Sequence, residues 1–321
     1  MSNNRVLSRR KFLGTSLGAG AALTLSPSFL ALAQNASPIM RPIPSSGQML
    51  PAIGLGSSAT FAQVARSEDI SAVRDVLQRM HSLGGRVFDT APSYGASEEV
   101  AGQIAQELGI NDSLFWATKV NVAGRDGGSA DPQAAREQIE TSFERIAKPV
   151  IDLIQVHNMG DPDTQLGILR EYKEAGRIRY MGITTTFPGQ YDHLIEVMRS
   201  QPLDFIGIDY AVDNRDVEET ILPLAQERGI GVLVYAPFGR TRLWSRVGDR
   251  PVPEYASEFD ASTWGQFFLK FVLSHPVVTA ATPSTSRPGN MEDNIGAMLG
   301  RLPDEAMRRR MIATVDELPM V

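Results

Sequence analysis

The sequence predicts an α/β protein folded as one parallel (β/α)8 TIM barrel, and three observations support this prediction. Short apolar runs alternate with helical patterns eight times within residues 48–321. The runs are continuously apolar, which is typical of parallel strands covered on both faces. About 250 residues of repeated strand and helix is the length that an eight-fold barrel needs. An open, doubly wound sheet is the alternative, and the pattern indicates a single domain.

The N-terminal region has the pattern of an export signal. Residues 8–14, SRRKFLG, match a twin-arginine signal. A stretch rich in Gly and Ala follows and ends at a small-x-small cleavage pattern, residues 31–33. Its low hydrophobicity argues against stable membrane insertion, although a basic N-terminus before a membrane anchor is the alternative. We expect a signal peptide over residues 1–33, a linker over 34–47, and periplasmic export by the twin-arginine machinery.

The charge balance excludes several functions. The expected signal holds four of the 31 basic residues and none of the 37 acidic ones, so the rest of the chain has a net charge of −10. This charge does not suit nucleic acid or anionic lipid, which need a positive surface. The chain has no Cys, which excludes thiol nucleophiles and Cys-ligated zinc. It also fits export into an oxidising compartment.

The expected elements follow one another as strand and helix. The strands are expected at residues 51–56, 86–89, 114–118, 150–156, 178–183, 205–210, 230–235 and 277–282. The helices are expected near residues 70–80, 100–108, 131–146, 161–176, 191–198, 217–225, 264–273 and 291–298, with a last one at 303–316. Ser67 is the expected cap of the first helix, and Asp131 and Asp161 each precede a proline that begins a helix.

Ionisable residues stand at the ends of three consecutive expected strands. The second strand ends in Asp89, and Tyr94 follows in the next loop. The third strand runs into Lys119 and the fourth into His157. Because parallel strands place their ligand sites at the carboxyl edge, we expect the four side chains to lie together there. The structural alternatives are an Asp that caps its own turn and a core histidine.

One glycine motif points elsewhere. Residues 54–59, GLGSSA, match the G-x-G-x-x-G/A dinucleotide pattern after a strand. That pattern requires a helix that opens at once and an acid about 20 residues later. Here the next helix is expected near Ser67 and the next strand ends at Asp89. We interpret the match as fortuitous, although Gly56 still offers a place where a ligand can approach the backbone.

Several short motifs at the expected strand ends resemble the aldo-keto reductase family over about residues 40–300. In chain order they are FDTAPSYG, ATKV, VHN, MGIT, YAPFG and PSTSRPGNMEDN. The resemblance implies a barrel that binds a nicotinamide cofactor across its mouth without a Rossmann domain. It also implies a catalytic tetrad of Asp89, Tyr94, Lys119 and His157.

The chemistry of this tetrad follows from its residue types. Hydride transfer to a carbonyl carbon leaves an oxygen that needs a proton, and Tyr94 is the expected donor. A free tyrosine has a pKa of about 10, and the ammonium of Lys119 is expected to lower it. Asp89 is expected to pair with Lys119, and His157 to bind and polarise the carbonyl oxygen. The other histidines, His81, His193 and His275, are expected to be structural.

The resemblance also implies contacts to the nicotinamide end of the cofactor. Thr184 and Thr185 stand where the family usually carries Ser-Asn, which binds the carboxamide. Tyr235 stands where an aromatic ring stacks on the nicotinamide, and Gly56 and Ser57 lie where the first strand meets the cofactor. One departure is Gly207, because the family commonly has Gln there for a carboxamide contact.

The adenosine end is expected after the eighth strand, at the start of a helix that favours an anion. The residues implied are Ser284, Thr285, Arg287, Asp293 and Asn294. Ser284 and Asn290 stand where the family usually has the positive pair that holds the 2′-phosphate. Arg287 can replace that pair, because a planar guanidinium suits phosphate. We therefore favour NADP(H) as cofactor, with NAD(H) as the alternative.

The predicted function is an NAD(P)H-dependent reductase of a small aldehyde or ketone. The alternatives are a non-catalytic nicotinamide-binding redox module or subunit, and a barrel isomerase or lyase with Lys119 as a Schiff base. No metal site is expected, because His157 has no second ligand at a suitable spacing. The sequence does not identify the substrate, and Trp116 and Trp244 are equally plausible as pocket walls or as core.

Overall fold

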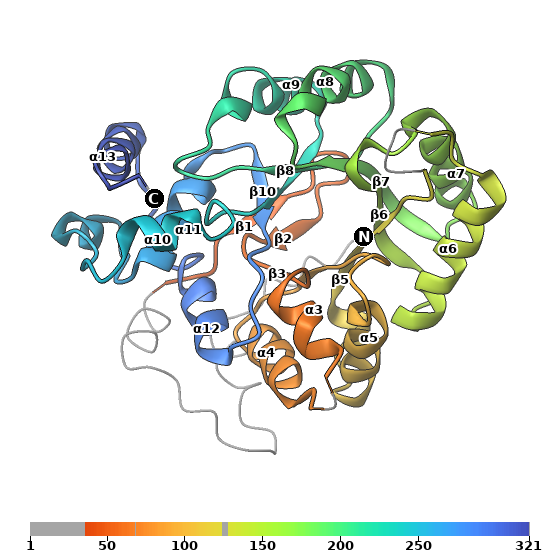
Figure 1. The fold of residues 1–321 in the computed structure, drawn as a ribbon, viewed down its shortest axis with the longest axis horizontal. Helices are drawn as coiled ribbons and strands as arrows, with labels where there is room; N and C mark the ends of the chain where they lie inside the picture. The colour runs from red at the N-terminus through yellow and green to blue at the C-terminus, as the bar shows by residue number, and fades with distance from the viewer. Residues whose placement is uncertain (1–35, 68, 124–127, 321) are drawn as a thin grey trace, which may run out of the picture.

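The computed structural model describes residues 36–67, 69–123 and 128–320 and confirms the barrel. The expected export signal lies outside these residues. One sheet contains eight parallel strands that neighbour each other in chain order (Figure 1). The strands are β3 (Leu55–Gly56), β4 (Val87–Asp89), β5 (Phe115–Val120), β6 (Ile151–Val156), β7 (Ile178–Thr185), β8 (Phe205–Asp209), β9 (Gly231–Tyr235) and β10 (Val278–Ala281).

The sheet closes on itself between its first and last strands. Parallel bridges join Ile53 to Ala281 and Gly56 to Ser284. A Cβ at Gly56 would lie 2.6 Å from the carbonyl oxygen of Thr282, so only glycine allows the strands to come this close. The alternative of an open, doubly wound sheet is therefore wrong. The close packing of the barrel wall explains why residue 56 is glycine.

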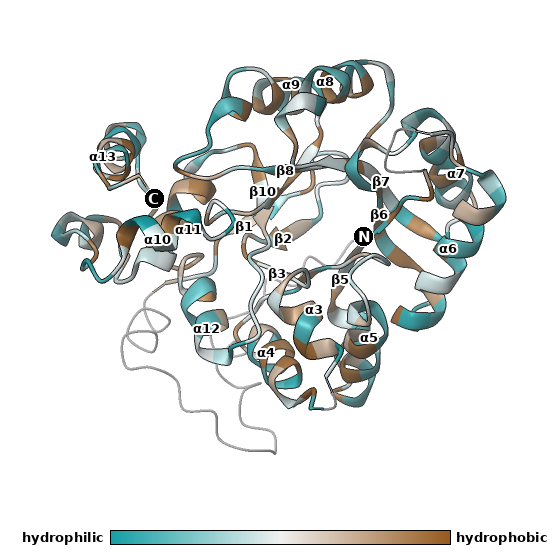
Figure 2. Ribbon diagram, in the orientation of Figure 1, coloured by the Kyte–Doolittle hydropathy of each residue, from teal (hydrophilic) through white to brown (hydrophobic). Residues whose placement is uncertain are grey.

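Helices surround the barrel, and their outer rim is largely hydrophilic (Figure 2). The helices that follow the strands are α4 (Ser71–Ser82), α5 (Ser97–Glu107), α6 (Pro132–Ile146), α7 (Pro162–Glu174), α8 (Tyr191–Ser200), α9 (Ile221–Arg228), α11 (Trp264–Ser274) and α12 (Pro288–Gly296), with α13 (Glu305–Asp316) last. The 3-10 turns are η2 (Asn111–Ser113), η3 (His157–Met159), η4 (Pro188–Gln190), η5 (Asp216–Glu218) and η6 (Glu254–Phe259). The side chains of Asp131 and Asp161 cap α6 and α7, as expected.

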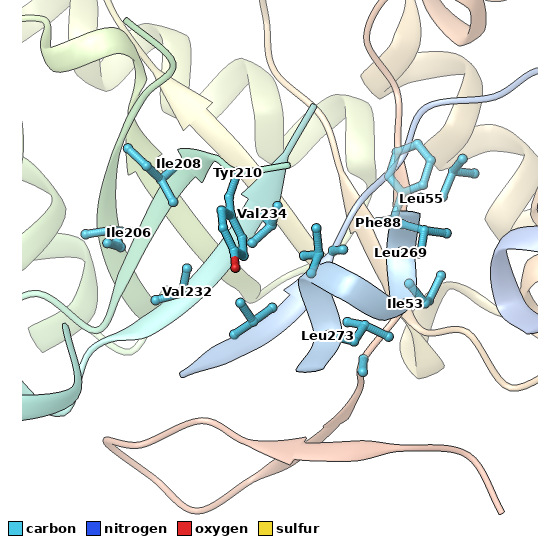
Figure 3. Close-up of a cluster of buried hydrophobic side chains, with 14 of the residues drawn as sticks. Ile53, Leu55, Phe88, Ile206, Ile208, Tyr210, Val232, Val234, Leu269 and Leu273 are labelled. Atoms are coloured by element: carbon cyan, nitrogen blue, oxygen red, sulfur yellow. The ribbon is translucent and has the colours of Figure 1, made fainter. Parts of the chain in front are cut away.

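Alternation along each strand divides the core into two parts. Outward-facing residues pack under the helices in one large cluster, which includes Ile206, Val232 and Leu273 of α11 (Figure 3). Burial of each such side chain contributes about 1.5–3 kcal/mol. Inward-facing residues form a second cluster inside the barrel, namely Ile43, Leu50, Val87, Phe115, Ala117, Leu153, Tyr180, Phe205, Leu233 and Ala280.

The expected linker over residues 34–47 is not a plain linker. β1 (Met40–Pro42) pairs antiparallel with β2 (Met49–Pro51). Ile43 and Leu50 of this hairpin join the interior cluster, because the amino end of the barrel needs an apolar cover. The expected first strand is accordingly split, with residues 49–51 in the hairpin and only residues 55–56 in the barrel.

Three further boundaries differ from the expected ones. A short helix, α3 (Thr60–Ala65), precedes α4, and Ser67 bonds to the carbonyls of Val64 and Asp69 after α3 rather than capping α4. The loop after β9 contains another short helix, α10 (Arg242–Val247). Lys119 lies within β5, one residue before its end, rather than after the strand.

Candidate active site

A cavity of about 1010 Å³ opens at the carboxyl ends of the barrel strands. This is at the upper end of the size range of ligand pockets. The expected tetrad borders it: Asp89, Tyr94, Lys119 and His157. The structure therefore brings together four residues that lie up to 68 positions apart in the chain.

Asp89 and Lys119 form a buried ion pair, which confirms the expected pairing. Lys119 Nζ lies 2.7 Å from Asp89 Oδ1, and the side chains are 1% and 5% exposed. The same ammonium donates to the carbonyl oxygen of Thr90 at 2.8 Å. Asp89 pairs with Ala117 in the sheet, and Lys119 stands two residues further along β5, so both side chains point into the barrel.

Tyr94 lies in the turn that follows β4. Gly95 has a φ of +64°, and the Arg66 guanidinium occupies the space where a Cβ would be, so glycine is needed there. Lys119 Nζ lies 5.1 Å from the centroid of the Tyr94 ring. The Tyr94 and His157 rings meet edge to face, with centroids 5.8 Å apart. The phenol thus lies between an ammonium and an imidazole.

His157 directly follows β6, and its backbone is held by Asn121. The Asn121 side-chain amide donates to the His157 carbonyl oxygen at 2.7 Å. Burial, reinforced by the charge of Lys119, lowers the pKa of His157 to about 3. The imidazole is therefore neutral at physiological pH and keeps one N–H for donation.

The pKa of Tyr94 departs from the expectation. Burial raises it above the usual value, and Lys119 counteracts this rise only in part. Lys119 has the expected lowering effect on the pKa of Tyr94, but the loss of water around the phenolate outweighs it, so the pKa is raised overall. Burial would lower the pKa of Lys119, but Asp89 and Tyr94 raise it overall, so Lys119 stays an ammonium.

A second phenol reaches the ion pair. The Tyr235 hydroxyl donates to Asp89 Oδ2 at 2.9 Å, and the Gln155 side-chain amide donates to the same hydroxyl at 3.0 Å. Lys119 Nζ also lies 5.1 Å from the centroid of the Tyr235 ring. The sequence had placed Tyr235 at the cofactor but not at Asp89.

Most of the expected cofactor-binding residues border the cavity. They are Gly56, Thr184, Tyr235, Ser284, Thr285, Arg287, Asp293 and Asn294. Ser57 and Thr185 do not. Ser57 is fully buried, and the Thr185 hydroxyl bonds to Gln190 and to the backbone of Phe187. Thr185 follows Thr184 in β7, so its side chain points to the other face of the strand.

The sequence analysis assigned no role to Asn158, Thr186 and Phe187, which border the cavity. Arg240 begins the loop over residues 240–259 that was expected to form pocket walls; it borders the cavity and donates to the Thr186 hydroxyl at 3.0 Å. Arg240 has a positive φ of 61°, which a sequence pattern does not reveal. A sequence signal existed for Asn158, because it directly follows His157 in the VHN motif.

Of the two tryptophans considered as pocket walls, one borders the cavity and the other lies in the core. Trp244 borders the cavity and is 40% exposed. Trp116 is fully buried and packs against Phe88. His81 and His275 lie away from the cavity, where His81 bonds to Ser113 and His275 packs against Tyr210.

The far end of the cavity fits a nucleotide phosphate. Thr285, Arg287 and Asn290 border it beside the N-terminus of α12, where backbone N–H groups and a cation favour an anion. Asp293 is tied to α11 through Thr263 and Gln266, and burial raises its pKa. The Arg287 side chain and the start of α12 therefore make this part of the wall suitable for a phosphate group.

The described residues, which leave out 1–35, 68, 124–127 and 321, contain no cluster of three or more His, Asp or Glu side chains placed to hold a metal ion. They also contain no helix with the length and hydropathy of a membrane span.

The closed parallel barrel carries a buried Asp–Lys pair, a phenol and a neutral imidazole at its carboxyl end, and these groups suit acid–base chemistry. Comparison with known proteins gives the family. The sequence pattern of the Aldo/keto reductase family matches residues 52–313. The chain therefore belongs to this family and is an NAD(P)H-dependent oxidoreductase.

Individual relatives agree with this assignment. Aldo-keto reductase str7 of Strobilurus tenacellus is 27% identical over 300 residues, which cover 83% of this chain and 87% of that protein. The NADH-specific methylglyoxal reductase of Escherichia coli (strain K12) is 27% identical over 223 residues, 63% of this chain and 68% of that protein. An aldo-keto reductase from Klebsiella pneumoniae, solved in complex with NADPH, has the same fold, with a TM-score of 0.69 and 21% identity over 88% of this chain and 100% of that one.

Proposed function

We propose that this protein reduces an aldehyde or ketone with NADPH and that Tyr94 donates the proton. The observation that carries the proposal is the placement of Tyr94 between the Lys119 ammonium and the His157 ring, at the edge of the cavity. The named relatives, which include an NADPH-bound structure, support the nicotinamide cofactor.

Each residue of the tetrad has one task in this mechanism. A nicotinamide bound in the cavity would supply the hydride for the carbonyl carbon. His157 is neutral, so it donates an N–H to the carbonyl oxygen and polarises it. Tyr94 gives its phenolic proton to that oxygen as negative charge develops there. Lys119 stabilises the tyrosinate that remains, and Asp89 holds the ammonium in place.

The proposed role of Tyr94 is tested by the Tyr94→Phe variant. We expect kcat for NADPH oxidation, measured across a panel of aldehydes and ketones, to fall at least about 100-fold, since a general acid contributes about 10²–10⁴-fold. The melting temperature and the Kd for NADPH should stay close to those of the wild type. Wild-type kcat in Tyr94→Phe would refute the role of Tyr94. A wild type that binds NADPH but turns over no carbonyl compound would instead identify a non-catalytic module.

The preference for NADPH is proposed to depend on Arg287, which borders the cavity at the start of α12. Arg287→Ala removes the charge that would face a 2′-phosphate, so we expect the Kd for NADPH to rise about 10-fold. The Kd for NADH should change little. Nucleotide titration of both proteins measures this, and an equal loss for the two cofactors would contradict the assignment.

We further propose that residues 1–33 direct export to the periplasm by the twin-arginine route. Because that route carries folded proteins, NADPH would be bound in the cytoplasm and exported with the barrel. In cell fractionation, a variant with Lys at both Arg9 and Arg10 should stay in the cytoplasm. Absence of nicotinamide from an acid extract of the exported protein would refute the loading.

A further inference from the structure

We infer that Tyr235 is a positioning residue of this active site, whose hydroxyl holds Asp89 in place for Lys119, and that residue 207 is glycine to admit the Tyr235 ring. The inference deepens the proposed reductase function and rests on it. It concerns the hydroxyl of Tyr235, whereas the expected cofactor contact concerns its ring, and the residue borders the cavity.

The carboxylate of Asp89 is held from two sides. Lys119 donates to Oδ1 at 2.7 Å, and the Tyr235 hydroxyl donates to Oδ2 at 2.9 Å. Among the described residues Oδ2 has no other donor. An ionised carboxylate only accepts hydrogen bonds, so the phenol must donate to it. The Gln155 amide, which donates to the phenol oxygen at 3.0 Å, then fixes the direction of the chain from Gln155 through Tyr235 to Asp89.

The space for this ring is provided by Gly207. Gly207 of β8 and Tyr235 of β9 both point into the barrel on neighbouring strands. A Cβ on Gly207 would lie 2.7 Å from the Tyr235 Cζ and hydroxyl oxygen and nearer still to Cε2. Real Cβ atoms do not approach so closely, so any other residue at 207 would displace the edge of the ring that carries the hydroxyl. Gly207 is not in the left-handed region, so no turn requires glycine there.

The charges around Asp89 show what the hydroxyl does. Lys119 faces Asp89 from β5, Tyr235 from β9 and Tyr94 from the loop after β4. Arg240 after β9 acts on Tyr94, and His157 after β6 feels the charge of Lys119. Burial raises the pKa of Asp89, and Lys119 and Tyr235 oppose that rise. Without the hydroxyl, Asp89 is expected to take up a proton at a higher pH, so the ion pair with Lys119 is lost at a higher pH as well.

The test is the Tyr235→Phe variant, which keeps the ring and removes the hydroxyl. We expect kcat for NADPH-dependent reduction to fall about 10-fold, as for loss of a hydrogen bond to a charged group. The acid-side pKa of the kcat profile should move up by about one unit, with KM for the carbonyl compound and Kd for NADPH nearly unchanged. The matched control is Tyr180→Phe, which removes a phenol from the same barrel interior, where its hydroxyl bonds to Ser46 and Gln48. Its profile should match the wild type.

A second readout uses the protein without cofactor. In Tyr235→Phe the pKa of Asp89 in the folded state is raised further above its unfolded value, so stability falls more than in the wild type as the pH rises through that pKa. The melting temperature of Tyr235→Phe should therefore lie further below that of the wild type at a pH above the acid-side pKa of its kcat profile than at a pH below it. The deficit of Tyr180→Phe should be the same at both pH values.

Gly207→Ala tests the second half of the inference. It should lower kcat like Tyr235→Phe in the wild-type background and have little effect in a Tyr235→Ala background, where there is no ring to displace. Wild-type kcat and acid-side pKa in Tyr235→Phe, or an equal effect of Gly207→Ala in both backgrounds, would overturn the inference. If no carbonyl compound is turned over by the wild type, the proposed function fails, and the melting series still decides the Asp89 contact.

Discussion

Tyr180 and Tyr235 face the interior of the barrel at its two ends, and their hydroxyls bind different kinds of partner. At the amino end, the Tyr180 hydroxyl bonds to the neutral side chains of Ser46 and Gln48, next to the β1–β2 hairpin. At the carboxyl end, the Tyr235 hydroxyl bonds to the ionised Asp89. Between them lies an apolar layer that includes Leu153, Phe205 and Leu233.

This difference teaches how one barrel separates stability from chemistry. The amino end is covered by the hairpin, and the partners of the Tyr180 hydroxyl are uncharged, although Gln48 also accepts from Arg179 at 2.6 Å. The carboxyl end keeps an ammonium and a carboxylate out of water beside an open cavity. Barrel enzymes place their active sites at the carboxyl end, and here the electrostatic contrast between the ends makes the division measurable.

The largest effect is expected from breaking the charged end with Lys119→Met. This change leaves Asp89 buried without its cation, so the free energy of unfolding should fall by about 3–5 kcal/mol. Turnover should fall at least about 100-fold. The double variant Lys119→Met with Asp89→Leu should recover the stability and remain inactive, because it removes both charges. Urea unfolding and NADPH oxidation measure the two quantities. A single variant as stable as the wild type would mean that Asp89 is not ionised.

A smaller effect is expected from the pH dependence of His157. Its pKa of about 3 in the folded protein lies below the usual value of about 6.5. Between about pH 7 and pH 5 the unfolded chain therefore binds a proton here that the folded protein does not, which costs about 2 kcal/mol of stability. Between about pH 7 and pH 5, the free energy of unfolding of His157→Gln should therefore fall by about 2 kcal/mol less than that of the wild type. Urea unfolding at both pH values checks this, and parallel losses would show that the folded imidazole titrates normally. The other histidines are common to both proteins and cancel.

The smallest effect is expected at the amino end of the barrel. Tyr180→Phe removes two hydrogen bonds between uncharged groups, so the free energy of unfolding should fall by about 1 kcal/mol. The kcat for carbonyl reduction should not change. A reduced kcat in this variant would show that the two ends are coupled through the apolar layer, and would remove the contrast on which the comparison rests.

The sequence predicted the charged end better than the covered end. Lys119 and His157 stand out because an ionisable residue at the end of an apolar run is conspicuous. The β1–β2 hairpin gave no such signal, since each strand has three residues among prolines and serines. Sequence reasoning therefore recovered the barrel and the grouping of Asp89, Tyr94, Lys119 and His157 at one cavity, but it treated the covering hairpin as part of a linker.

The errors at the site have a geometric cause. Thr184 and Thr185 are neighbours in the sequence, but alternation along β7 sends only Thr184 to the cavity. The contact between Tyr235 and Asp89 joins residues 146 positions apart, and no local pattern encodes it. Its only trace in the sequence was Gly207, a glycine where the family commonly has a longer side chain.

The apolar layer beneath Lys119 has a consequence for the order of events in catalysis. Side chains such as Leu153 and Leu233 fill the axis of the barrel below the charges, so they block the passage of water from the hairpin end. In the proposed mechanism, the proton that Tyr94 gives up would have to be replaced through the mouth of the cavity, which substrate and product would also use. Reprotonation of Tyr94 and exchange of substrate and product would then share one opening, and the order of these two events would set when the next turnover begins.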